Sequence, residues 1–135
     1  MNHLTSTMTV SSNIENIKLL MDWIKSDLKP LFKVSDKYMH LKLCLQEALT
    51  NSIIHGNLED EKKKLTVSYI IEDRLKIKIE DEGNGILENN QKKDIKDIEK
   101  KDVFNESGRG IMLMKHFCDE VIFDKNIITL VIQYK

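Results

Sequence analysis

Hydrophobic and polar residues alternate along the chain in a way that first predicts a strand and then a helix. Residues 3–10 alternate in polarity, which is typical of an edge strand. Over residues 14–28 the apolar positions recur with the period of a helix, and Pro30 follows them as a stop. Ser12 and Glu15 have the spacing of a capping box, so we expect them to close the N-terminus of this helix.

A second, longer helix is expected over residues 35–53. Ser35 and Asp36 favour its start, and Gly56 is placed to cap its C-terminal end. Its apolar positions recur closely enough for the helix to be mostly buried. These positions are Met39, Leu41, Leu43, Leu45, Ala48, Leu49 and Ile53.

The remainder of the chain predicts two hairpins and a third helix. The period changes to two over residues 65–71 and 75–79, which are separated by a short polar turn. A helix is expected over 111–117, and two strands follow it over 120–124 and 127–134. Hairpins require antiparallel neighbours, so this order predicts an α+β fold with helices on one face of a mainly antiparallel sheet, a two-layer sandwich.

Between the hairpin and the third helix lies a charged segment, residues 87–107, that is poor in large apolar side chains. It is either a solvated loop with a weak helix or a lid over a ligand. Long connections inside a compact domain are more often functional or disordered than inert, which favours the lid.

Composition indicates one cytoplasmic domain. The chain has 135 residues, of which 41% are hydrophobic, enough for one core without disulfides or a structural metal. Its 21 lysines and arginines are balanced by 22 acidic residues, which argues against direct nucleic-acid or membrane binding. Cys44 and Cys118 stand alone in apolar segments, as buried thiols do in a reducing compartment.

The first segment with possible chemistry is residues 46–52 in the second helix. Glu47 and Asn51 are four positions apart and therefore project from one face. A carboxylate in an otherwise apolar helix is costly unless it meets a metal, water or substrate proton. An exposed polar stripe on an amphipathic helix is the alternative, and the pair alone does not decide between them.

The second segment follows the strand over 75–79. Strand parity sends Asp81 inward, on the same side as the apolar residues of that strand. Gly83 and Gly85 remove side chains just beyond it, which would let a flat ligand approach the backbone. A turn whose glycines only supply positive φ is the simpler alternative.

The third segment, residues 106–114, is expected to be a glycine-rich turn that enters a helix. Gly108 and Gly110 flank Arg109 there. Backbone N–H groups and the positive end of the helix dipole would favour a phosphate at this turn. It is not a Walker loop, because it lacks the Gly-Lys-Ser/Thr ending, and a hinge with a helix cap is the alternative.

In this order the three segments resemble the N, G1 and G2 boxes of the GHKL ATPases, over nearly the whole chain. Within that superfamily the chain is most similar to the bacterial anti-sigma-factor serine kinases. The similarity lies in the sequences Glu-Ala-Leu-Thr-Asn-Ser-Ile-Ile-His-Gly, Asp-Glu-Gly-Asn-Gly-Ile and Ser-Gly-Arg-Gly-Ile-Met-Leu-Met.

This resemblance implies a role for each matching residue. Glu47 would be the general base and Asn51 the Mg²⁺ ligand, while Asp81, supported by Thr50, would bind the adenine amino group of ATP. Gly83 and Gly85 would border the adenine, and Gly108, Arg109 and Gly110 would surround the phosphates. Relatives often carry a basic residue where this chain has Glu106, so Arg109, Lys100 or Lys101 would have to contact the γ-phosphate.

The family's activity implies an ATP-dependent serine kinase that phosphorylates an anti-sigma-factor antagonist and sequesters a sigma factor. A non-catalytic module whose partner affinity is gated by ATP is one alternative, and a switch kinase with a different partner is another. A homodimer is expected, because the last strand has apolar residues of both parities, including Ile127 and Val131.

Overall fold

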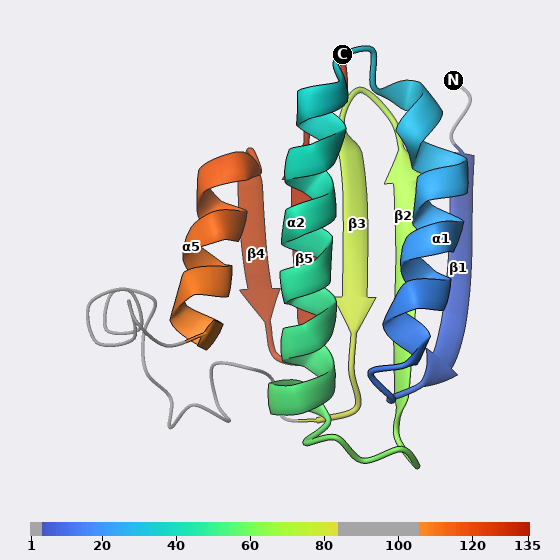
Figure 1. Ribbon diagram of the computed structural model, residues 1–135, viewed down its shortest axis with the longest axis vertical. Helices are drawn as coiled ribbons and strands as arrows, with labels where there is room; N and C mark the ends of the chain where they lie inside the picture. The colour runs from blue at the N-terminus through green and yellow to red at the C-terminus, as the bar shows by residue number, and fades with distance from the viewer. Residues whose placement is uncertain (1–3, 84–105) are drawn as a thin grey trace.

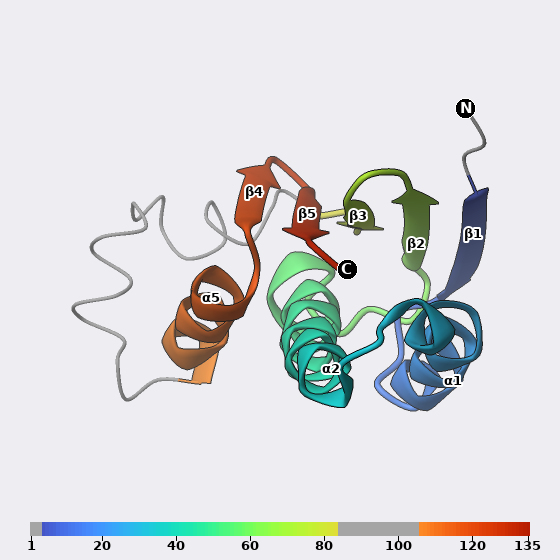
Figure 2. The same ribbon diagram turned by 90° about the horizontal axis from the view of Figure 1, so that it is seen from above.

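The computed structural model describes residues 4–83 and 106–135, which form a five-stranded sheet covered by helices on one face (Figures 1 and 2). The strands have the spatial order β1-β2-β3-β5-β4, and each neighbouring pair is antiparallel. Their bounds are β1 Leu4–Ser11, β2 Lys64–Ile71, β3 Leu75–Glu80, β4 Glu120–Asp124 and β5 Ile127–Ile132. The predicted α+β sandwich and the edge position of the first strand are confirmed.

Helices α1, α2 and α5 lie side by side over the sheet (Figure 2). A 3-10 turn, η1, continues from α1 and contains Pro30, and a π-helical turn, η2, continues from α2. Their bounds are α1 Asn16–Leu28, η1 Lys29–Leu31, α2 Ser35–Asn51, η2 Ser52–Gly56 and α5 Glu106–Phe117. Among the residues described, no helix combines the length and apolar character needed to cross a membrane.

The core lies between the sheet and the helices, and β3 shows why. Its side chains alternate strictly between buried and exposed, with Leu75, Ile77 and Ile79 facing the helices. Leu41 and Leu45 on α2 are fully buried against this layer. Burying such side chains stabilises the fold by roughly 1.5–3 kcal/mol each, which fixes the strand register.

The start of α1 differs from the predicted capping box. The N–H of Glu15 donates to Asn13 Oδ1 at 2.9 Å, and no side-chain cap bond is made by Glu15. Ser12 is held at the end of the β1–β2 ladder, because its N–H donates to the Lys63 carbonyl at 2.9 Å. Its buried hydroxyl has no hydrogen-bond partner among the described residues, and Asn13 accepts the bond at the helix start instead.

The predicted apolar stripe of α2 is also narrower than expected. Met39 and Leu43 are 50% and 42% exposed, whereas Leu41 and Leu45 are buried. The two pairs follow the same i, i+4 spacing on different faces of the helix, and only one face meets the sheet. Most of the predicted lid, residues 87–107, falls outside the described residues.

Candidate functional site

The three segments singled out in the sequence come together at one end of the sandwich. Figure 1 shows the C-terminal end of α2, the end of β3 and the first turn of α5 at the same end of the molecule. Gly110 makes the connection between α5 and α2. A β-carbon at this position would lie 2.7 Å from Glu47 Oε2 and 3.2 Å from Asn51 Nδ2.

Asn51 is buried, so an exposed polar stripe does not describe its face of α2. It is 2% exposed, and its amide nitrogen has no hydrogen-bond partner among the described residues. Glu47, one turn earlier, is half-buried. An unpaired buried polar group costs roughly 1–3 kcal/mol, a cost that a bound ligand can remove.

The π-helical turn η2 brings the end of the α2 segment against the second segment. At Gly56 a β-carbon would lie 2.1 Å from Asp81 Oδ2, and at Gly83 it would lie 1.8 Å from the Gly56 carbonyl oxygen. Both positions therefore need glycine for close approach of the backbone. Such π turns are rare and occur frequently at functional sites.

Asp81 points inward, as strand parity predicts, and is 1% exposed. Its Oδ1 accepts a hydrogen bond from the Gly83 N–H at 2.8 Å. Burial raises the pKa of Asp81 above its ordinary value, while the Gly83 N–H and the charge of Lys63 act in the opposite direction. The result is a fixed, buried hydrogen-bond acceptor whose second oxygen lies beside Gly56.

Two asparagines that sequence reasoning missed hold this turn in place. Asn57 is fully buried; its Oδ1 accepts the Glu82 N–H at 2.7 Å, and its amide donates to the Lys64 carbonyl at 3.0 Å. The Asp81 N–H donates to the Asn126 carbonyl at 3.0 Å, and the Asn126 side-chain amide donates to the Asp81 carbonyl at 2.5 Å. Their positions beside turns were the only signal available in the sequence.

The third segment is helical rather than a turn. Helix α5 begins at Glu106, so residues 108–110 lie within its first turns. Packing explains the difference, because Gly110 is buried against α2 and serves there as a close-contact residue. The N–H groups that would favour an anion are then those of the first turn of α5, where the helix dipole is also positive.

Some predicted residues are described only partly. Gly85 lies outside the described residues, and the side chains of residues 106–109, including Arg109, are not described either. Thr50 is half-buried, next to Asn51. In the parts of the chain that are described, Gly110 approaches Glu47 and Asn51, while Asp81 and Gly83 approach each other and Gly56, five residues after Asn51.

The donor set fits a nucleotide better than a metal ion alone. A buried carboxylate suits a base amino group, and a helix N-terminus suits phosphates. Within residues 4–83 and 106–135 there is no cluster of three or more His, Cys, Asp or Glu side chains that would hold a metal. A Mg²⁺ ion at Asn51 would therefore need oxygens from phosphates and water.

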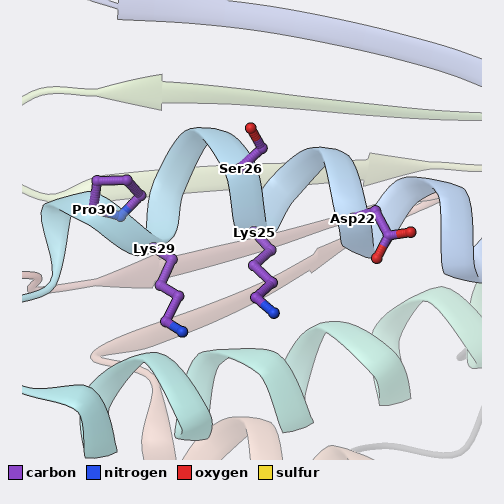
Figure 3. A pocket seen from close by; sticks show the side chains of 5 residues that line it. All are labelled: Asp22, Lys25, Ser26, Lys29 and Pro30. Carbon is purple, nitrogen blue, oxygen red and sulfur yellow. The ribbon is translucent and has the colours of Figure 1, made fainter.

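A separate pocket of about 520 Å³ lies along α1, away from these segments (Figure 3). Lys25 of α1 and Lys29 of η1 extend toward α2 there, and Asp22, Ser26 and Pro30 complete the lining. None of the residues that carry the predicted chemistry lines it.

Comparisons with known proteins agree with the observed fold. A family model described as the histidine kinase-like ATPase domain matches residues 10–132. An anti-sigma F factor of Geobacillus stearothermophilus is 30% identical over 118 residues, covering 87% of this chain and 80% of the relative. One from Bacillus subtilis (strain 168) is 31% identical over 104 residues, covering 76% and 70%. One from Clostridium perfringens is 38% identical over 98 residues, covering 70% and 69%.

Proposed function

This chain belongs to the histidine kinase-like ATPase family, and we propose that it is an ATP-dependent serine kinase that acts as an anti-sigma factor. The observation that supports the catalytic part is the close approach of Gly110 in α5 to both Glu47 and Asn51 of α2. In this proposal Glu47 is the base, Asn51 is the metal ligand, and the N-terminus of α5 binds phosphate. The names of the similar proteins, anti-sigma F factors, support the regulatory part.

In this proposal adenine binds at the turn after β3. The Asp81 carboxylate accepts a hydrogen bond from the adenine amino group, with Thr50 in support. Gly83 and Gly85 leave room for the ring. Burial of Asp81 and its bond from Gly83 support this role, because they hold the acceptor in one orientation before ATP arrives.

The phosphates are then directed toward the first turn of α5. Its N–H groups, together with Gly108, Arg109 and Gly110, surround them, and the buried Asn51 amide completes the site from α2. The side-chain oxygen of Asn51 would be the ligand that this chain offers to Mg²⁺. The ion would supply charge neutralisation for the β- and γ-phosphates.

Phosphoryl transfer at this site needs one proton acceptor. The serine hydroxyl oxygen of a substrate protein forms a bond to the γ-phosphorus, the bond between that phosphorus and the β,γ-bridging oxygen breaks, and ADP leaves. The serine proton passes to Glu47. The half-buried position of Glu47 against Gly110 supports this role, since a base must lie within hydrogen-bond reach of the attacking group.

The substrate in this proposal is an anti-sigma-factor antagonist, and the protein sequestered by the unoccupied kinase is a sigma factor. The experiment uses the candidate antagonist and sigma factor encoded nearest to this gene. We expect ATP labelled at the γ-phosphate to label a serine of the antagonist, and the kinase to bind the sigma factor only while the antagonist is phosphorylated or absent. Binding of both proteins with no transfer would instead favour an ATP-gated binding module.

We also propose a homodimer, through the sheet face that the helices leave open. Val131 was expected to contribute to this surface, but it is only 1% exposed in the single chain. It lies between its cross-strand neighbours Lys76 and Glu120. Ile122 on the same face is 48% exposed. Sedimentation should show a dimer for the parent chain and a monomer for Ile122→Glu, and a monomeric parent would contradict this proposal.

A further inference from the structure

The two cysteines of the chain, far apart in the sequence, meet between α2 and the end of α5. Their side chains share a hydrogen bond. Cys44 Sγ also donates to the carbonyl of Leu113 in α5 at 3.6 Å, and the Cys118 N–H donates to the Met114 carbonyl at 2.9 Å. The expectation of free, buried thiols is confirmed, but they are neighbours rather than isolated residues.

Neighbouring contacts fix this arrangement independently. His40, one turn before Cys44 on α2, stacks on Phe117 of α5 with ring centroids 4.1 Å apart. Both cysteines belong to the hydrophobic core cluster. The two sulfurs are therefore held by a packed interface between helices and not by a mobile surface.

The hydrogen bond makes the two thiols unequal. Donation from Cys118 lowers the pKa of Cys44, against the opposing effects of burial and of Glu47. The same bond, together with burial, raises the pKa of Cys118. The first proton lost from the pair therefore leaves a Cys44 thiolate in contact with the Cys118 thiol, which is the form that reacts with oxidants.

Solvent reaches the pair from the Cys118 side. Cys44 is fully buried, whereas Cys118 is 7% exposed. Its sequence neighbours Phe117 and Asp119 line a pocket of about 250 Å³, together with His40 and His116. A small oxidant in this pocket would contact the two residues that flank Cys118 in the chain.

We propose that Cys44 and Cys118 form a reversible intramolecular disulfide when the protein meets a peroxide. The two sulfurs lose one electron each and form the S–S bond, and the peroxide O–O bond breaks as it accepts both electrons. The two thiol protons leave with the two oxygens as water. A thiol reductant reverses the reaction by exchange through a mixed disulfide.

The cross-link would join the two helices that border the nucleotide site. Cys44 lies one turn before Glu47 on α2, and Gly110, at the other end of α5, packs against Glu47. A covalent tie at the C-terminal end of α5 would restrict any movement of α5 relative to α2. Resting on the proposed ATP binding, we expect slower nucleotide release from the oxidised protein.

Thiol mapping tests the cross-link without nucleotide. The full chain is treated with hydrogen peroxide, quenched, unfolded and alkylated. Since the chain has only 2 cysteines, the parent should lose both titratable thiols, show a mass lower by two hydrogen atoms, and recover both thiols on reduction. Cys44→Ser and Cys118→Ser should show no such mass loss. Two alkylated thiols in the parent, under conditions that oxidise glutathione, would overturn the proposal, as would separate addition of oxygen to each sulfur.

Release of a fluorescent ATP analogue is the second measurement. It should slow in the oxidised parent, return to the starting rate after reduction, and stay unchanged in peroxide-treated Cys118→Ser. Equal release from oxidised and reduced parent would remove the regulatory consequence. A parent that binds no nucleotide would contradict the proposed function alone, because the thiol mapping would still stand.

Discussion

Gly110 of α5 lies against Glu47 of α2, so closely that a β-carbon at position 110 would come within 2.7 Å of the Glu47 carboxylate. This contact joins two segments that are far apart in the chain. It accounts for glycine inside a helix, where glycine otherwise costs about 1 kcal/mol relative to alanine. It also means that the position of the candidate base depends on the packing of α5.

Gly110→Ala should therefore reduce phosphoryl transfer with little loss of folded protein. The added methyl group must displace the Glu47 side chain or the helix, and a misplacement of about 1 Å can cost roughly 10²-fold in rate. The better helix propensity of alanine offsets part of the overpacking cost. Met112→Ala, at a 41% exposed position of the same helix, is the control and should keep the parental rate. If the parent, Gly110→Ala and Met112→Ala all transfer phosphate at the same rate, Gly110 does not influence the catalytic site.

Asp81→Asn should weaken ATP binding by about 1–3 kcal/mol, because a buried acceptor is replaced by a group that also donates. Adenine specificity should fall with it, since the parent distinguishes an amino group from the carbonyl oxygen of guanine. Calorimetry with ATP and GTP measures both effects. Unchanged ATP affinity, or equal GTP binding by the parent, would remove Asp81 from the adenine site.

The raised pKa of Asp81 predicts opposite pH trends for binding and for stability. Only the ionised carboxylate is a pure acceptor, so ATP affinity should fall as the pH decreases through the raised value. The folded chain takes up this proton more readily than the unfolded chain, so the group's contribution to stability falls as the pH rises from the ordinary aspartate pKa through the raised one. Affinity titrations against pH should show this dependence in the parent and lose it in Asp81→Asn.

Tyr69→Phe offers a structural control far from the site. The Tyr69 hydroxyl donates to Asp27 Oδ2 at 2.6 Å, and burial followed by this bond raises the pKa of Tyr69 to about 12. Its ring packs on Trp23 with centroids 5.6 Å apart, and phenylalanine keeps that contact. We expect a loss of roughly 0.5–1.5 kcal/mol in denaturant unfolding and an unchanged ATP affinity. A change in ATP affinity would show that the sheet and the site are coupled.

Periodicity was sufficient to predict the sheet and the inward position of Asp81. In β3 the alternation of buried and exposed side chains is strict, and continuing it by one residue turns Asp81 toward the helices. Because side chains along a strand alternate between two faces, the only alternative is to turn β3 over. That arrangement would expose its whole apolar face to solvent. The same reasoning placed Glu47 and Asn51 on one face of α2, because their spacing is that of a helical turn.

Contacts between distant segments were not predictable from periodicity. The approach of Gly56 to Asp81 involves the π turn η2, and the approach of Gly110 to Glu47 joins α5 to α2. The capping box at Ser12 failed because the strand ladder holds that residue. The meeting of Cys44 and Cys118 likewise arises only in three dimensions, since each cysteine lies in an ordinary apolar segment.

The role of Glu47 as the base is the central claim, and comparison of Glu47→Gln with the parent tests it most directly. Transfer of the labelled γ-phosphate to the antagonist and affinity for ATP are measured on the same preparations. Glutamine keeps the size of the side chain but takes no proton, so transfer should fall by about 10²-fold or more while ATP affinity stays at the parental value. Transfer at the parental rate by Glu47→Gln would contradict the account.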